Sequence, residues 1–188
     1  MKPLFTVHAG EYLVATEIER RFRKLPTLDV WVPSMDRGID LLVTNPATQK
    51  MVSLQVKFSK DFTQNQKWGT LERSFKSTGF WKHSRDKLRE SPADRCVFVL
   101  PSFEYKDNSF VLIPPKELLR RLSIIHTEHT ATIYSYFWIT RGNKGKCWET
   151  RGASKDEKQA MINGEYPLEK RDFSSFLNNW DLMTEKLK

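Results

Sequence analysis

Apolar side chains near the start of the chain recur at the spacing of an α-helix. Val14, Ile18 and Leu25 lie at spacings of four and seven residues, and basic side chains fall outside this stripe. Pro26 ends the pattern, because proline cannot continue a helix. The sequence therefore predicts an amphipathic helix over residues 8–25.

Three segments with the pattern of β-strands follow this helix. Residues 28–32 form a short apolar run, whereas residues 38–44 and 51–58 alternate between apolar and polar positions. Residues 45–48 read Asn-Pro-Ala-Thr, which is typical of a tight turn. We therefore expect one strand and then a β-hairpin.

The rest of the chain mixes helical and strand patterns. Residues 60–79 are polar and aromatic without a clear period. Beyond them the patterns predict helices at 80–90, 116–122 and 173–182, strands at 95–100 and 109–113, and a second hairpin with arms at 131–140 and 146–150. This order predicts a mixed α/β fold, that is, α+β with a mixed sheet. We expect a single domain over 1–188, with a core at 8–122 and a C-terminal elaboration at 123–188.

Positive charge is concentrated in the middle of the chain. The 188 residues include 31 basic and 23 acidic side chains, and residues 50–95 alone carry 11 basic and 5 acidic ones. Aromatic residues such as Trp68 and Phe80 are interleaved with these charges. The mixture suits phosphate neutralisation beside base stacking, but a solvated basic face over core aromatics has the same composition. Composition alone leaves both interpretations open.

Membrane insertion and disulfide bonding are not indicated. The longest apolar runs, such as 39–43 and 96–100, have about five residues, whereas a bilayer span needs about 20. The N-terminal residues lack the apolar core of an export signal, so we expect a cytoplasmic protein. Cys96 and Cys147 are too few for a disulfide framework and too far apart for a close metal-ligand spacing, so we expect both to be reduced and structural.

Three polar side chains interrupt the apolar arms of the first hairpin. If the hairpin turns at its midpoint, Asp40 lies opposite Gln55. Lys57 then shares the face of Gln55, because successive side chains of a strand alternate between faces. This face is opposite to that of Leu54 and Val56. Strand interiors disfavour Asp, Gln and Lys, so the three side chains are expected to face water or a functional site.

The first helix adds an acidic residue. At about 100° per residue, Glu11 lies about 60° from Val14 on the side of Ile18, within the apolar stripe, whereas Glu17 lies on its flank. A carboxylate within a buried stripe needs a partner such as a metal ion, a lysine or water. We therefore prefer Glu11 over Glu17 as a site residue.

This set of residues suits a divalent cation and phosphate chemistry. Two carboxylates, an amide oxygen and a lysine form a site of hard oxygen ligands that fits Mg²⁺ or Mn²⁺. The chemistry that follows is phosphodiester hydrolysis, in which the metal polarises the phosphate and activates water. Lys57 would orient that water or stabilise charge in the transition state.

The motifs Gly10-Glu11, Gly38-Ile39-Asp40 and Gln55-Val56-Lys57, in this order, resemble those of the PD-(D/E)XK nuclease superfamily, in the variant with GhD followed by QhK. The resemblance implies a restriction-endonuclease-like αβββαβ core over about residues 8–100 and DNA cleavage in restriction, repair or recombination. It implies the catalytic residues Glu11, Asp40, Gln55 and Lys57, and metal ligation by Asp40, Gln55, the Val56 backbone carbonyl and Glu11, the last directly or through water. Ile39 replaces the usual proline and Gln55 replaces the usual acid, which removes one negative charge from the metal site.

A basic track is expected to carry the DNA next to this site. Its members follow the second arm of the hairpin, with the first ones on a loop that closes over the DNA backbone. They are Lys60, Lys67, Arg73, Lys76, Lys82 and Arg85. The sequence is compatible with a homodimer but does not determine the oligomeric state.

Several alternatives remain. Asp40 and Lys57 could form a cross-strand ion pair on a surface hairpin. The neutral Gln55 could leave a protein that binds nucleic acid without cleaving it, or the basic segment could dock an acidic partner in an assembly. His126 and His129 lack the further ligands that zinc requires, and a Ser34–His83–Asp86 triad lacks a nucleophile elbow. The tryptophans of the C-terminal part are expected in the core or in a dimer interface, and they are Trp138, Trp148 and Trp180.

Overall fold

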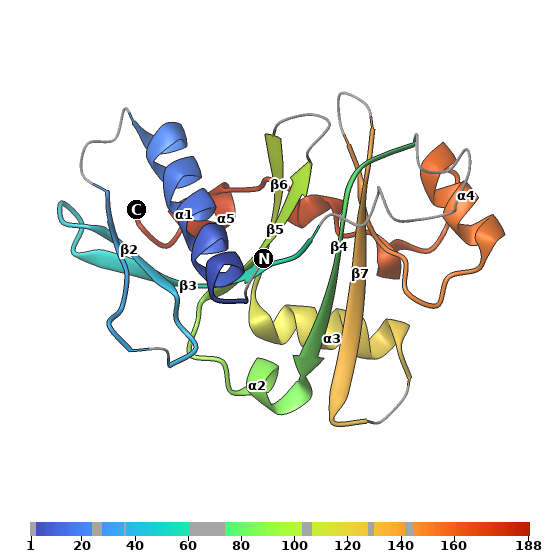
Figure 1. Cartoon of the computed structure of the whole chain (residues 1–188), viewed down its shortest axis with the longest axis horizontal. Coiled ribbons are helices and arrows are strands. Elements are labelled where there is room, and N and C mark those ends of the chain that lie inside the picture. Colours follow the sequence, from blue (N-terminus) through green and yellow to red (C-terminus); the bar gives the residue numbers. More distant parts are fainter. Residues whose placement is uncertain are drawn as a thin grey trace.

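The computed structural model describes residues 3–23, 28–35, 37–60, 74–102, 107–127, 130–141 and 145–188. These residues form a five-stranded sheet and a three-stranded sheet with helices packed around them (Figure 1). The helices are α1 (Pro3–Phe22), α2 (Arg85–Arg89), α3 (Pro115–Ile125), α4 (Lys155–Asn163) and α5 (Asp181–Thr184), with 3₁₀ turns η3 (Glu169–Arg171) and η4 (Ser174–Phe176). The strands are β1 (Asp29–Trp31), β2 (Leu41–Asn45), β3 (Lys50–Phe58), β4 (Phe75–Ser84), β5 (Arg95–Ser102), β6 (Asp107–Ile113), β7 (Thr132–Thr140) and β8 (Cys147–Glu149).

The larger sheet has the strand order β1-β2-β3-β5-β6. The β3–β5 pair is parallel and the other pairs are antiparallel, so the predicted mixed α/β class is confirmed. One face of this sheet packs against α1 and the C-terminal segment, in a core that includes Val14, Ile18, Leu54 and Trp180. Apolar residues at alternate strand positions supply this face, as the pleat requires.

The smaller sheet has the order β4-β7-β8 and covers the other face of the larger one. Trp81 and Phe137 from the smaller sheet meet Phe98 of β5 and Leu118 of α3 in a second core. The ring centroids of Trp81 and Phe98 lie 4.8 Å apart. Trp138, Trp148 and Trp180 are all buried, so of the two expected places, the core or a dimer interface, they occupy the core.

The first hairpin has the predicted register. Leu41 pairs with Leu54 and Asn45 with Lys50, so residue numbers on paired positions keep the constant sum that places Asp40 opposite Gln55. The first helix is also confirmed, although it begins earlier than predicted and ends at Phe22.

The prediction of a helix over residues 80–90 is wrong in its first half. Residues 75–84 form β4, and only Arg85–Arg89 are helical. Gly79, Trp81 and His83 are buried, whereas Phe80 and Lys82 between them are exposed. This alternation is the two-residue period of a strand. The helical prediction failed because the apolar pair Phe80-Trp81 hides this period: Phe80 is exposed, whereas Trp81 is buried.

The predicted terminal helix over 173–182 is also wrong. The chain instead forms η4 and the short α5, separated by Asn178 with a positive φ of 51°. Asn178 donates its backbone N–H to the carbonyl of Phe110, so tertiary pairing interrupts the helix. Sequence reasoning missed α4, whose signal is the capping box formed by Ser154 and Glu157.

None of the helices in the described part of the chain is long and apolar enough to cross a membrane.

Candidate active site

Asp40 lies just before β2, where a glycine lets the chain turn into the strand. Gly38 has a φ of 82°, a left-handed conformation that side chains disfavour. The Asp40 backbone N–H donates to the Leu54 carbonyl at 2.8 Å. The Asp40 carboxylate accepts the backbone N–H of Val56 at 2.6 Å, a charge-assisted bond that holds the carboxylate against β3.

Gln55 and Lys57 project from the same face of β3 and are half-buried. This is the face opposite to Leu54 and Val56, which pack in the core under α1, so the predicted division of faces is confirmed. The neighbouring strand β5 places Cys96 beside Gln55, and the Cys96 thiol donates a weak hydrogen bond to Gln55 Oε1 at 3.8 Å. The two polar side chains thus lie between the two sheets.

The charges of Lys57 and Asp40 change the pKa values of buried side chains near β3. Burial raises the pKa of the Cys96 thiol to about 12, while Lys57 lowers this pKa and Asp40 raises it. Burial and the nearby Lys57 ammonium together lower the pKa of His83 to about 3. Asp40, Gln55 and Lys57 are therefore grouped around the β3–β5 pair, next to an uncharged imidazole.

His83 is the neighbour of this site that sequence reasoning missed. It lies on β4, is 4% exposed, and its Nε2 is 2.9 Å from Ser135 Oγ on β7. The two-residue period of β4 is the signal that would have placed His83 in the interior. The predicted helix over residues 80–90 concealed this period. The sequence suggested Ser34 and Asp86 as partners of His83, but in the fold its hydroxyl partner is Ser135.

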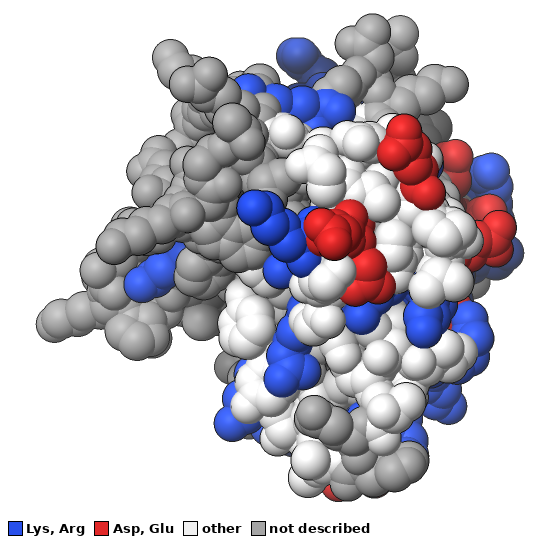
Figure 2. All heavy atoms as spheres, turned by 90° about the vertical axis from the view of Figure 1, so that its right-hand side faces the viewer, with Lys and Arg blue, Asp and Glu red and all other residues white. Residues whose placement is uncertain are grey.

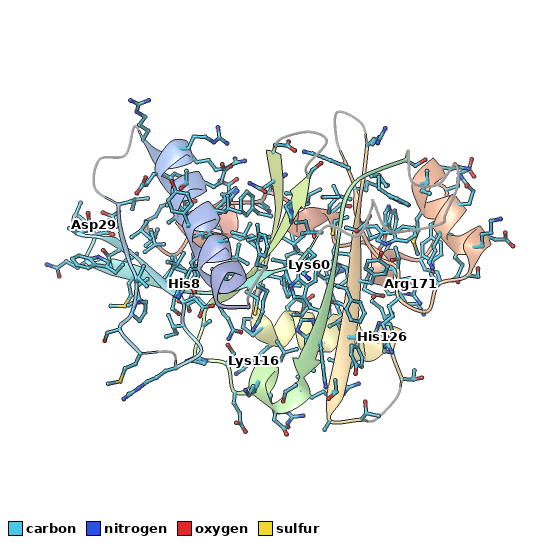
Figure 3. The ribbon with its side chains drawn as sticks, viewed as in Figure 1. His8, Asp29, Lys60, Lys116, His126 and Arg171 are labelled. Atoms are coloured by element: carbon cyan, nitrogen blue, oxygen red, sulfur yellow. The ribbon has the colours of Figure 1, made fainter. Side chains whose placement is uncertain are left out.

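Glu11 comes from α1, on the other face of the larger sheet. The helix approaches β3 closely at Gly10, where a Cβ atom would lie 2.8 Å from Phe58 Cβ. Glu11 Oε2 is 3.3 Å from Nδ1 of the exposed His8, which Figure 3 places near the N-terminal end of α1. The side chains of Glu11 and Glu17 are 13% and 14% exposed, so burial does not separate the two acids. Glu17 instead differs in being paired with two arginines.

The donor set fits a hard divalent cation only if amide and backbone oxygens contribute. Within the described residues no three His, Cys, Asp or Glu side chains lie close enough together to hold a metal ion. Asp40 offers a carboxylate, Gln55 an amide oxygen and Val56 a backbone carbonyl, all from the paired ends of β2 and β3. Mg²⁺ commonly takes one or two carboxylates and completes its coordination with water and phosphate oxygens. The residues present are compatible with such an ion.

The predicted DNA-contacting residues fall into different surroundings. Lys60 and Lys82 are exposed. Lys76 Nζ forms an ion pair with Asp107 at 2.6 Å, and Arg85 Nη1 donates to Ser123 Oγ at 2.7 Å. Lys67 and Arg73 lie outside the described residues. Figure 3 shows Lys60 in the middle of the molecule, between α1 and β4.

Comparisons with known proteins give one distant structural likeness. No protein-family model matches the chain. No curated protein matches it either. One solved structure, described as that of a bacterial homing endonuclease, I-Ssp6803I, is similar with a TM-score of 0.42 and 15% sequence identity, over 77% of this chain and 82% of that chain. A likeness of this degree assigns neither an activity nor functional residues to this chain.

Proposed function

We propose that this protein is a metal-dependent nuclease of the PD-(D/E)XK type that hydrolyses DNA phosphodiester bonds in restriction, repair or recombination. The observation that carries the proposal is the grouping of Asp40, Gln55 and Lys57 at the paired ends of β2 and β3. The hydrogen bond from Val56 orients the carboxylate of Asp40 at this point. Strand interiors disfavour lysine and burial penalises its charge, so a half-buried Lys57 on β3 favours a chemical role.

The proposed mechanism assigns one task to each side chain. Asp40 and Gln55, with the Val56 carbonyl, would hold Mg²⁺ or Mn²⁺. Glu11 approaches from α1, on the other face of the sheet, so it would act on this ion through water and not as a direct ligand. The bound ion supplies activation of water and polarisation of the phosphate. Lys57 would orient the attacking water or stabilise the negative charge that develops on the phosphate oxygens. Lys60, which follows β3 and is exposed, would bind the DNA backbone next to the scissile phosphate.

Cleavage assays with two substitutions test this assignment. Asp40→Asn retains an oxygen that can accept the Val56 N–H but removes the charge, and Lys57→Met retains the aliphatic stem. We expect each to reduce cleavage of plasmid DNA in Mg²⁺ or Mn²⁺ by about 10²-fold or more, as removal of one group that stabilises transition-state charge does. Lys50→Met is the matched control, because Lys50 lies at the other, exposed end of β3.

The outcome separates the main candidates. Wild-type cleavage by either site variant, with an unchanged melting temperature, would refute the assigned site. A protein that binds DNA in a salt-dependent manner but cleaves it with neither metal would be the degenerate binder, the candidate that the neutral Gln55 favours. Absence of both cleavage and salt-sensitive DNA binding would refute the nuclease and the binder together.

A further inference from the structure

The outer face of the smaller sheet carries a row of aromatic side chains. Phe80 of β4 pairs with Tyr136 of β7, and Lys82 pairs with Tyr134, so these side chains share one face. Their inward neighbours Trp81 and His83 occupy the opposite face. We call Phe80, Tyr134 and Tyr136 the aromatic strip.

One end of this sheet face is covered and the other is open. Trp138 is 1% exposed, because Phe75 and residues of α4 pack over it. Phe80 is 41% exposed, and the two tyrosines are half-buried. An exposed phenylalanine flanked by two tyrosines is an unusual surface for a strand, since apolar rings gain free energy from burial.

The rings of the strip present flat surfaces. The Phe80 and Tyr134 centroids lie 5.8 Å apart with an interplanar angle of 23°, which is a stacked arrangement. Tyr136 meets Phe80 edge to face at 6.0 Å and 77°. Phe80 is the most exposed ring of the strip, so it is the ring on which a planar ligand can extend the stack.

Basic groups accompany these rings. The Arg151 guanidinium lies 4.5 Å from the centroid of Tyr134, and Lys82, which pairs with Tyr134, is exposed. Figure 2 views the molecule from the α4 side and shows acidic side chains mainly in its upper half and basic ones in both halves. Flat rings beside positive charges are complementary to bases joined by phosphates.

The strip lies across the edge of β4 from the proposed active site. The backbone N–H of Phe80 donates to Ser59 Oγ at 3.0 Å, and Ser59 Oγ is 3.4 Å from the Phe80 carbonyl oxygen. Ser59 follows β3 directly and lies two residues after Lys57 and one before Lys60. A polynucleotide strand that extends from Lys57 past Ser59 and over the edge of β4 would reach Phe80.

We infer that the aromatic strip binds unpaired bases of single-stranded DNA by stacking on Phe80, whose ring is backed by Tyr134, with Lys82 and Arg151 neutralising the adjoining phosphates. The inference rests on the proposed function for DNA as the ligand, and it extends that function to substrates with a single-stranded segment. Base stacking on aromatic side chains tolerates any sequence, so the strip selects unpaired strands and not particular bases.

Binding in EDTA tests the inference without any cleavage. The probes are labelled oligonucleotides of about 16 nucleotides, long enough for a single-strand site: one single-stranded, one fully paired, and one single-stranded with central abasic positions. We expect Phe80→Leu to weaken binding of the first by about tenfold and to leave duplex binding unchanged. Wild type should bind the abasic strand about as weakly as the variant binds the intact one. Lys82→Met should reduce the salt dependence by about 0.7 in log K per log salt.

Trp31→Leu is the matched control, because Trp31 is 58% exposed on β1 at the far edge of the larger sheet. Its binding should equal that of wild type, and thermal melts should show that all three variants fold. Wild-type affinity of Phe80→Leu for the single strand, or an equal loss for single strand and duplex, would overturn the inference. No single-strand binding by the wild type would also overturn it. If the wild type binds the single strand selectively but does not cleave DNA, this result would count against the proposed nuclease activity and not against the inference.

Discussion

Acidification is expected to destabilise the protein through His83. This side chain is buried between the two sheets, accepts or donates one hydrogen bond with Ser135, and has its pKa lowered to about 3 by burial and by Lys57. In the unfolded chain the imidazole has an ordinary pKa near 6.5. Between these two values the unfolded chain binds a proton that the folded protein excludes, so the free energy of unfolding falls as the pH falls.

The size of this effect follows from the pKa difference. Each pH unit below the unfolded pKa costs about 1.4 kcal/mol, so lowering the pH from 7 to 5 removes about 2 kcal/mol of stability. Paired carboxylates contribute little over this range. For example, the hydrogen bond from Arg120 is the largest cause that lowers the pKa of Glu117 to about 2, so Glu117 stays ionised at pH 5.

Urea unfolding at pH 7 and pH 5 measures the loss. His83→Gln keeps a polar group for Ser135 but cannot be protonated, so its stability should change much less between the two values. Lys57→Met should raise the pKa of His83 while leaving it below 6.5, because burial is the larger cause. The acid loss of this variant should therefore level off at a higher pH than that of the wild type. An equal loss in wild type and His83→Gln would refute the reasoning.

Two further predictions concern a buried ion pair and a close helix–strand contact. Glu149 is fully buried and its Oε2 accepts from Arg171 at 2.8 Å, so Glu149→Gln should cost about 3 kcal/mol or more in urea unfolding by leaving a buried guanidinium without its anion. Glu117→Gln, which breaks partly exposed pairs, is the control and should cost about 1 kcal/mol or less. Gly10→Ala should cost about 1–3 kcal/mol, because the new methyl group would meet Phe58 Cβ at 2.8 Å. An unchanged melting temperature would contradict the close approach of α1 to β3.

The spacing of apolar and polar residues by itself determined those helices and strands that have one buried face and one polar face. The apolar stripe of α1 and the alternation of β2 and β3 follow from backbone periods of about 3.6 and 2 residues, which hold whatever the neighbours are. The hairpin register also followed locally, because a short turn fixes which residues pair. That register is what places Asp40 opposite Gln55 and on the face of Lys57.

Tertiary structure decided what these patterns leave open. Residues 75–84 became β4 because β7 pairs with them along their length, a contact between segments about 50 residues apart that no local period reports. The same pairing buried His83 beside Ser135 and left Phe80 exposed beside Tyr134. The neighbours of the candidate site, and the surface next to it, thus depend on long-range strand pairing, whereas the polar residues of the site follow from the sequence of one hairpin.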